Sequence, residues 1–348
     1  MSFSKLQTEV INTKEPKVVV LASAAAGKTR CMTERVRKML RDGIDPYDIA
    51  CITFTNLSAQ ELRDRLGADY RDEMYVGTIH GLANKFLVTH GISTGSLIEN
   101  EQFDQFFSLL QEHPYCVRHI KHILLDEAQD TSPDQYDFIF KMIKPETFFV
   151  VGDTKQSIFS FRQADPELLE DLCYEPGVTV YNLNENYRNG SNILAYAKRI
   201  IAKAHMRDES VPIRSGGLVY EGETDILNLK GWIKSKGTYG SWAVLCSTNG
   251  DIAMVRKELE KDNIPTVTFR QGELNRAQLE SLMKQDAVKV LTRHSSKGLE
   301  FDNVAVWAPQ WWGGDEAYRV NYVAATRARD ILLWMEAPKK KKTKRKYF

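Results

Sequence analysis

Lys17 to Thr29 read KVVVLASAAAGKT, and this stretch decides the fold. Its first part is a short β-branched apolar run, which is typical of a strand buried on both faces. Small residues follow, and residues 29–40 then have the spacing of an amphipathic helix. A strand that turns tightly into a helix is the repeating unit of α/β proteins, so the same alternation is expected along the rest of the chain.

That alternation is present. Further apolar runs predict buried strands at 49–54, 120–125, 148–151, 242–246, 288–291, 303–307 and 331–335. Amphipathic stretches predict helices at 57–66, 79–89, 133–142, 191–203 and 252–259. We therefore expect an α/β protein with two doubly wound, parallel-sheet domains, at residues 1–184 and 185–337. Residues 338–348 would form a disordered basic tail.

Composition bounds the class of protein. A chain of 348 residues with 43% hydrophobic and 27% charged residues is typical of globular proteins with real cores. No apolar run approaches the ~20 residues of a membrane helix, and the amino terminus lacks the layout of a signal peptide. The five cysteines form no CxxC pair, which favours a reducing, cytoplasmic setting. Basic residues crowd the tail from Lys339, so any nucleic acid bound by the rest must meet a local groove.

The small-residue loop after the first strand predicts a phosphate site. Backbone N–H groups of such a loop and of the following helix face an anion, and Lys28 would reach the β- and γ-phosphates of a nucleotide. The Thr29 hydroxyl would hold Mg²⁺. The loop residues expected to bind the nucleotide are Ala24, Ala25, Ala26 and Gly27. The alternative is an ordinary strand–helix turn, which the run of small residues before Gly-Lys-Thr disfavours.

An acidic pair follows the predicted strand 120–125. Asp126 and Glu127 would lie at the carboxyl end of a parallel strand, where ligands of α/β sheets bind. Asp126 would then hold Mg²⁺ and Glu127 would orient the attacking water. Alone, the pair is better explained by a solvated acidic loop. Together with the phosphate loop, it predicts a site of ATP hydrolysis that uses Mg²⁺.

The box D126-E-A-Q-D-T131 resembles the DExQDT box of the UvrD/Rep helicases, the A branch of superfamily 1. Other family boxes are matched in order along the chain. They are Gln7 (Q motif), 53–56 (motif Ia), 77–80 (the TxH box), 151–159 (motif III), 183–188 (motif IV), 294–301 (motif V) and 322–329 (motif VI). Eight ordered boxes are far more specific than a single motif.

The resemblance implies roles for further residues. Arg188 and Arg327 would be arginine fingers from the second of two RecA-like domains, with the ATP cleft between the domains. Gln156 would sense the γ-phosphate. Adenine and the rest of the nucleotide would be contacted by Gln7, Tyr187, Arg30 and Glu300.

The resemblance also implies a track for single-stranded DNA. Such tracks combine aromatic stacking with phosphate contacts. The candidate residues in the matched boxes are Phe54, Thr78, His80, Phe159, Phe161, Arg162 and His294. Core packing is the alternative for each phenylalanine. If 159–161 is extended, both of its rings lie on one face. The pair Trp311-Trp312 lies outside the boxes and fits a DNA-stacking loop or a packed hydrophobic turn equally well.

The chain departs from the family in three places. Ser23 and Ala25 replace loop glycines, and alanine is expected there only if φ is negative. The segment 92–118 leaves room for a minimal 1B insertion, with a short helix at 102–110. Between Arg188 and His294 the second motor domain needs most of the residues, so the 2B domain is expected to be absent or vestigial.

These features predict an ATP-dependent translocase or helicase of single-stranded DNA, moving 3′→5′ as a monomer. A forked duplex and a protein partner that supplies the missing accessory function are further expected ligands. The alternative is an ATP-gated nucleic-acid-binding or assembly factor that needs a partner for unwinding. A P-loop kinase or small GTPase is excluded, because it would not need the two arginines and the boxes around them.

Overall fold

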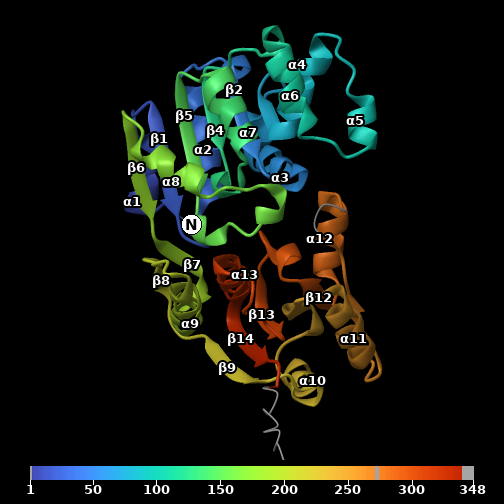
Figure 1. The fold of residues 1–348 in the computed structure, drawn as a ribbon. Coiled ribbons are helices and arrows are strands. Elements are labelled where there is room, and N and C mark those ends of the chain that lie inside the picture. Colours follow the sequence, from blue (N-terminus) through green and yellow to red (C-terminus); the bar gives the residue numbers. More distant parts are fainter. Residues whose placement is uncertain (1, 271–273, 339–348) are drawn as a thin grey trace, which may run out of the picture. The chain divides into compact units, whose positions relative to one another are not determined.

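The computed structural model describes residues 2–270 and 274–338. The chain forms two compact units, each described here by itself (Figure 1). Of the described residues, 2–187 and 209–211 form the N-terminal unit, and 188–208, 212–270 and 274–338 form the C-terminal unit. The basic tail predicted at 338–348 lies, from residue 339, outside the described residues.

The N-terminal unit is built on one six-stranded sheet in the order β3-β2-β4-β5-β1-β6, and all of its pairings are parallel. Its strands are β1 (Lys17–Ala22), β2 (Ile49–Thr53), β3 (Tyr75–Thr78), β4 (His122–Leu125), β5 (Thr147–Gly152) and β6 (Val178–Leu183). Its helices are α1 (Lys5–Asn12), α2 (Lys28–Arg41), α3 (Asn56–Leu66), α4 (Ile79–Thr89), α5 (Gly95–Glu99), α6 (Gln105–Glu112), α7 (Pro133–Asp137) and α8 (Glu167–Tyr174).

Both faces of this sheet are buried. In β1, Val18 and Val20 enter one apolar core with α1, α2 and α3, whereas Val19 enters the opposite core with α4, α6 and α8. Successive side chains of a strand point to opposite faces, so a run of consecutive valines is what a strand covered on both sides requires. The predicted helix 133–142 is α7 followed by a π-helical segment at Phe138–Ile143.

The C-terminal unit repeats this architecture with a second all-parallel sheet, ordered β11-β12-β10-β13-β14-β9. Its strands are β9 (Leu218–Glu223), β10 (Trp242–Cys246), β11 (Thr266–Val267), β12 (Val288–Thr292), β13 (Phe301–Trp307) and β14 (Ala328–Glu336). Its helices are α9 (Ser191–Ile201), α10 (Ile226–Ser235), α11 (Asn249–Glu260), α12 (Arg276–Lys284) and α13 (Asp315–Ala325). Two parallel-sheet α/β units therefore confirm the predicted fold class.

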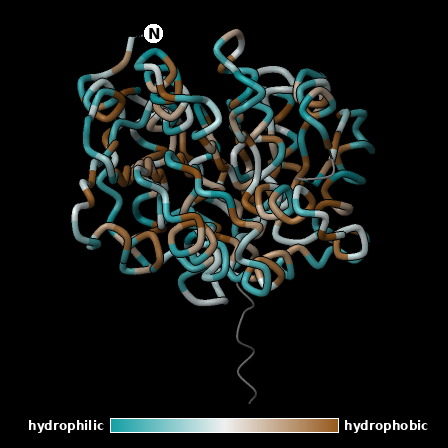
Figure 2. The backbone as a smooth tube through the Cα atoms, turned by 90° about the horizontal axis from the view of Figure 1, so that it is seen from above, coloured by the Kyte–Doolittle hydropathy of each residue, from teal (hydrophilic) through white to brown (hydrophobic). Residues whose placement is uncertain are grey.

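β7 (Glu185–Gly190) and β8 (Val211–Arg214) pair in a two-stranded sheet. Each of these strands contains a position at which the chain passes from one unit to the other. The hydropathy of the chain changes over short distances, with hydrophobic and hydrophilic segments alternating along the tube in Figure 2. Within residues 2–270 and 274–338, no helix combines the length and the apolar character that crossing a membrane would require.

Candidate nucleotide site and nucleic-acid interface

The phosphate loop follows β1 and ends at the amino terminus of α2. Gly27 is the N-cap of α2, with φ 82°, and provides no side-chain cap. The first N–H groups of a helix have no partner within the helix, so this end of α2 is able to bind an anion. The positive φ favours glycine here, and a Cβ built on Gly27 would lie 2.8 Å from Nε2 of Gln7 and would displace that side chain.

Ala25 contradicts the expectation that alanine occupies this loop only with a negative φ. Its φ is 61°, in the left-handed region that disfavours residues with a Cβ. Neighbouring backbone and side chains hold the loop in this conformation. The N–H of Tyr187 donates to the Ala25 carbonyl at 3.3 Å, and Nδ2 of Asn186 donates to the Ala24 carbonyl at 3.0 Å. The loop is thus supported by β7, a contact that the sequence analysis missed.

Four predicted catalytic and metal-binding side chains meet at the end of this loop. Nζ of Lys28 lies 3.4 Å from Oε2 of Glu127, and the Thr29 hydroxyl lies 3.2 Å from Oδ2 of Asp126. Strand β5 lies between β4, which carries the acidic pair, and β1, which carries the loop. The sheet therefore places these residues, 97 or more positions apart in sequence, on one edge.

The electrostatics of this cluster follow from its burial. Burial and the neighbouring Glu127 raise the pKa of Asp126 to about 6. Burial alone would lower the pKa of Lys28, but Glu127, Asp153 and Asp126 together raise it above its ordinary value. Lys28 therefore stays charged at neutral pH, while Asp126 ionises only as the pH rises through about 6.

The oxygen atoms of Thr29 and Asp126 fit the preferences of Mg²⁺. This ion favours oxygen ligands, keeps several waters and is bound through one or two carboxylates together with substrate phosphates. One hydroxyl and one buried carboxylate beside a phosphate loop match that pattern. Over residues 2–270 and 274–338 there is no group of three or more His, Cys, Asp or Glu side chains that could hold a metal alone.

The segment after β5 is linked through Gln129 to Glu127 of the acidic pair. Gln129 donates through Nε2 to the Glu127 carboxylate, and its Oε1 accepts the Asp153 N–H at 2.9 Å. Asp153 in turn accepts from Nε2 of Gln156 at 2.8 Å and pairs with Lys155. The predicted γ-phosphate sensor Gln156 is thus linked to Glu127 by a buried hydrogen-bond network. Gln129 and Asp153 were not predicted as site residues, although both lie inside matched boxes.

The residues predicted to contact the nucleotide base belong to α1, α2 and β7. Gln7 is buried in a capping box with Ser4 and donates through Nε2 to the Ala26 carbonyl at 3.0 Å. The guanidinium of Arg30 lies 4.0 Å from the ring centroid of Phe3. Tyr187 is partly exposed, and its hydroxyl donates to Glu185 at 2.9 Å. Gln7 therefore contacts the phosphate loop directly.

The two predicted arginine fingers lie together in the C-terminal unit. Nε of Arg188 donates to Oε2 of Glu300 at 2.8 Å, and its Nη1 donates to the Thr326 carbonyl at 3.3 Å. Arg327 is buried, and donates to the carbonyls of Val323 and Leu299. Burial would raise the pKa of Glu300, but Arg188 and Arg327 hold it below its ordinary value. Glu300 therefore remains an anion beside these arginines at neutral pH.

Four predicted nucleic-acid residues form an aromatic cluster, defined as Phe54, Phe159, Phe161 and Arg162. Phe54 and Phe159 are stacked, with centroids 5.1 Å apart, and Phe161 meets Phe159 edge-on at 5.8 Å. The Arg162 guanidinium lies within 5.9 Å of all three rings. Phe159 is only 6% exposed, whereas Phe161 is 67% exposed. Residues 160–162 form a 3₁₀ turn and not the extended segment considered from the sequence.

The remaining nucleic-acid candidates occupy different surroundings. Thr78 is the N-cap of α4 and accepts the Gly81 N–H. Nε2 of His80 lies 3.1 Å from Oδ1 of Asp104. His294 belongs to the C-terminal unit, where burial and Arg293 lower the pKa of its ring. His294 is therefore neutral at pH 7, and its contribution to a phosphate would be a hydrogen bond and not a charge.

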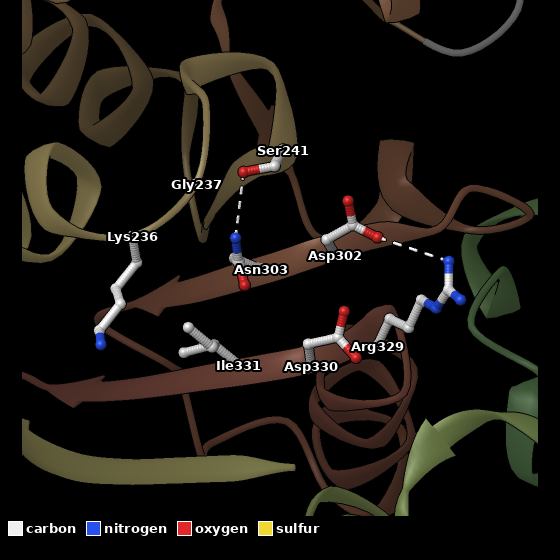
Figure 3. Close-up of a pocket in the computed structure, with 8 residues that line it drawn as sticks. All are labelled: Lys236, Gly237, Ser241, Asp302, Asn303, Arg329, Asp330 and Ile331. Atoms are coloured by element: carbon white, nitrogen blue, oxygen red, sulfur yellow. Dashed lines mark hydrogen bonds and ion pairs between the residues drawn. The ribbon is translucent and has the colours of Figure 1, made fainter. Parts of the chain in front are cut away.

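A shallow pocket of about 480 Å³ lies elsewhere, at the amino ends of β13 and β14 (Figure 3). Three of its charged side chains, Asp302, Arg329 and Asp330, form ion pairs. Arg329 points toward Asp302, and Asp330 lies 2.6 Å from Arg214. None of the predicted site residues lines it. We assign no function to this pocket.

A Gly-Lys-Thr loop between a parallel strand and a helix, with an acidic pair two strands away, defines a P-loop nucleotide-binding protein with two α/β units. The family model of the UvrD/REP helicase N-terminal domain matches residues 3–116 and 106–175, and that of the UvrD-like helicase C-terminal domain matches 270–337. The chain belongs to the UvrD/REP helicase family, as its boxes predicted.

Known members of the family align with most of the chain. DNA helicase II of Escherichia coli is 24% identical, over 76% of this chain and 51% of its own length. The ATP-dependent DNA helicase PcrA of Staphylococcus epidermidis is 24% identical, over 80% and 52%. A probable DNA helicase of Mycoplasma pneumoniae is 23% identical, over 90% and 79%. The chain thus spans about half the length of the first two relatives.

Proposed function

We propose that this chain is an ATP-driven translocase and helicase that moves 3′→5′ along single-stranded DNA. One observation carries the proposal. Lys28, Thr29, Asp126 and Glu127 meet at the amino terminus of α2, in a chain of the UvrD/REP family. Relatives named DNA helicase II and ATP-dependent DNA helicase PcrA support ATP and DNA as its ligands.

Each residue of this cluster has a chemical task in the proposal. The loop N–H groups and Lys28 bind the β- and γ-phosphates of ATP. Thr29 and Asp126 hold Mg²⁺, which neutralises charge on the phosphates when it is bound. Glu127 leaves Lys28 and orients the attacking water, while Gln129 keeps its carboxylate in place. Gln156 responds to the γ-phosphate through Asp153.

Coupling to movement requires the second unit. Arg188 and Arg327 belong to the C-terminal unit, so in the proposal they complete the site when ATP draws both motor domains together. ATP that is contacted by both domains closes the cleft, and hydrolysis releases it. In the same proposal, single-stranded DNA stacks on the aromatic cluster, and Thr78, His80 and His294 contact phosphates.

We further propose a motor with reduced accessory parts. The segment 92–118, proposed as a minimal 1B insertion, contains only α5, α6 and a short 3₁₀ turn. The N-terminal family model matches in two segments that overlap at 106–116, inside this region. The second motor domain occupies most of the residues between Arg188 and His294, which supports an absent or vestigial 2B domain.

The decisive experiment measures the ATPase rate with single-stranded DNA, duplex DNA and RNA. We expect stimulation by single-stranded DNA that Lys28→Ala and Glu127→Gln abolish. Lys28→Ala removes the phosphate contact, and Glu127→Gln removes the carboxylate that orients water. Arg199→Ala, an exposed arginine change in α9, is the matched control and keeps full activity. Wild-type turnover by Lys28→Ala would exclude the assigned site.

The direction of movement is tested separately. Streptavidin is bound to either end of a single-stranded oligonucleotide, and its displacement is followed with ATP. Faster displacement from the 5′ end is expected of a 3′→5′ translocase, and faster displacement from the 3′ end would contradict the polarity.

A second function is favoured by the short segment 92–118. With this region reduced, the second function is that of an ATP-gated nucleic-acid-binding or assembly factor that depends on a protein partner for unwinding. A strand-separation assay on a forked duplex discriminates between the two. The second function is supported if the chain hydrolyses ATP but separates strands only when a partner is added. Unwinding by the chain alone supports the first function.

A further inference from the structure

The loop between β13 and α13, residues 308–314, is held firmly at its start. The Ala308 N–H donates to the Met335 carbonyl at 2.8 Å, and the Ala308 carbonyl accepts from the Ser247 hydroxyl at 2.7 Å. Two residues later, the Gln310 carbonyl accepts from Nδ2 of Asn321 at 2.9 Å. Bonds from β14, the residue after β10, and α13 therefore fix the loop before its tryptophan pair.

The two tryptophans have different environments, which the sequence did not distinguish. Trp311 packs against Tyr318 and Trp334, with ring centroids 5.8 Å away in both cases, and Nζ of Lys203 lies 4.4 Å from its centroid. Trp312, in contrast, is 74% exposed. Trp311 is thus the packed hydrophobic residue, and it anchors a neighbouring indole that faces solvent.

Exposing an indole at a fixed position is unusual for a stable surface, because a side chain of this size gains much from burial. Gly313 and Gly314 follow with φ of 122° and 68°, conformations that disfavour other residues. The chain therefore turns directly into α13 just after the exposed Trp312. A rigid aromatic side chain of this kind loses little conformational freedom when it binds.

The loop also lies at a particular edge of the C-terminal sheet. β12 and β13 are both parallel to β10, so the loop after β13 and the segment after β12 leave the same edge. A buried pair joins them, because Arg293, which follows β12, bonds through Nη1 to Oδ1 of the same Asn321 that holds Gln310. Trp312 is thus connected to the segment that carries His294, a proposed phosphate contact.

We propose that Trp312 stacks on a base of single-stranded nucleic acid, which makes it a binding residue of the C-terminal unit. The inference rests on the proposed function and extends its track beyond the matched boxes. The charges nearby favour a base over a phosphate at the indole itself. Asp315 and Glu316 begin α13 and repel phosphates, whereas the exposed Lys203 beside Trp311 attracts the strand's backbone.

Equilibrium binding of two oligonucleotides of equal length tests this inference. One is oligothymidylate, and the other carries abasic sites and so keeps the phosphates without the bases. Trp312→Ala is expected to weaken binding of oligothymidylate about tenfold, since stacking of one base contributes roughly 1–3 kcal/mol. Binding of the abasic strand should stay unchanged. Trp312→Phe should retain most of the affinity because a ring still stacks.

Tyr174→Ala, which removes another highly exposed aromatic side chain, is the control and should bind as the wild type does. Thermal unfolding of each variant confirms that the fold is kept, as expected for exposed positions. Equal affinity of wild type and Trp312→Ala for oligothymidylate would overturn the inference while leaving the proposed function intact. A similar loss on both strands would also overturn it, because bases would not be involved. Failure of the wild type to bind either strand would instead reject the proposed function as well.

Discussion

The position of Asp126 lowers the stability of the folded chain at neutral pH. It is buried beside Glu127, and these two causes raise its pKa to about 6. The folded chain therefore holds a proton on Asp126 between about pH 4 and 6, where the unfolded chain has lost it. Stability from this group is present at low pH and is lost as the pH rises through the folded pKa. The carboxylate is thus retained against stability, which is typical of functional sites.

Asp126→Asn removes this titration and keeps a group that can accept from Thr29. We expect the free energy of unfolding of wild type, relative to Asp126→Asn, to fall by about 2 kcal/mol between pH 4.5 and 7.5. Urea unfolding with EDTA present, so that no metal compensates the charge, measures this difference. Curves that stay parallel over this range would show that Asp126 ionises normally in the folded chain.

Ala25 carries a different strain, in its backbone. Its φ of 61° costs an L-residue roughly 1–2 kcal/mol, which glycine avoids. Ala25→Gly is expected to raise the free energy of unfolding by about 1 kcal/mol, after the greater freedom of glycine in the unfolded chain is included. Ala24→Gly is the control, since Ala24 does not adopt a positive φ and the change should destabilise. A loss of stability in Ala25→Gly would contradict the assigned strain.

At the scale of elements, the sequence predicted interior strands and missed edge strands. The eight predicted strands are the four inner strands of each sheet, and β3, β6, β9 and β11 are the four edges. β1 reads as an apolar run because both of its faces are covered. β6 and β9 are only partly buried, so polar residues interrupt their patterns and no apolar run marks them.

The same distinction holds for the site. Short sequence motifs predicted the four residues of the cluster at the phosphate loop, which are Lys28, Thr29, Asp126 and Glu127. The support from β7 could not, since hydrogen bonds to the carbonyls of Ala24 and Ala25 depend on backbone positions distant in sequence. For the same reason, the sequence could not show that Phe161 is exposed while Phe159 is buried. That difference depends on the packing of Phe159 against Phe54.

Asn186 is therefore the place to test how β7 supports the phosphate loop. Its side chain is fully buried and donates to the Ala24 carbonyl. Asn186→Ala leaves that carbonyl without its donor, which is expected to lower the free energy of unfolding by roughly 1–3 kcal/mol. It should also raise the KM for ATP, because the loop is less well ordered. Asn192→Ala, which removes an exposed bond to the Gly217 carbonyl, is the control and should leave KM unchanged. An unaltered KM in Asn186→Ala would mean that the loop does not depend on β7.

At the scale of the whole molecule, the question is why two similar parallel-sheet units are joined in one chain. The phosphate loop and acidic pair belong to the N-terminal unit, and Arg188 and Arg327 belong to the C-terminal unit. If hydrolysis needs both units, altering only the arginines must reduce ATP turnover while nucleotide binding is kept. This separation is what distinguishes a two-domain motor from a single nucleotide-binding domain with an appended partner.

Arg188→Ala is the sharper of the two substitutions. Arg188 is held by Glu300 and the Thr326 carbonyl, whereas Arg327 is more deeply buried and its loss would disturb the fold of its unit. We expect Arg188→Ala to bind a fluorescent ATP analogue within a few-fold of wild type. Its kcat should fall at least about 100-fold, since an arginine finger contributes roughly 10³–10⁵ to turnover. Arg199→Ala, in the same unit, should retain both properties. If Arg188→Ala lost binding and turnover to the same extent, Arg188 would belong to the binding surface. If Arg188→Ala kept full turnover, the N-terminal unit would hydrolyse ATP without Arg188. Arg188 would then not couple ATP to the joint action of the two units.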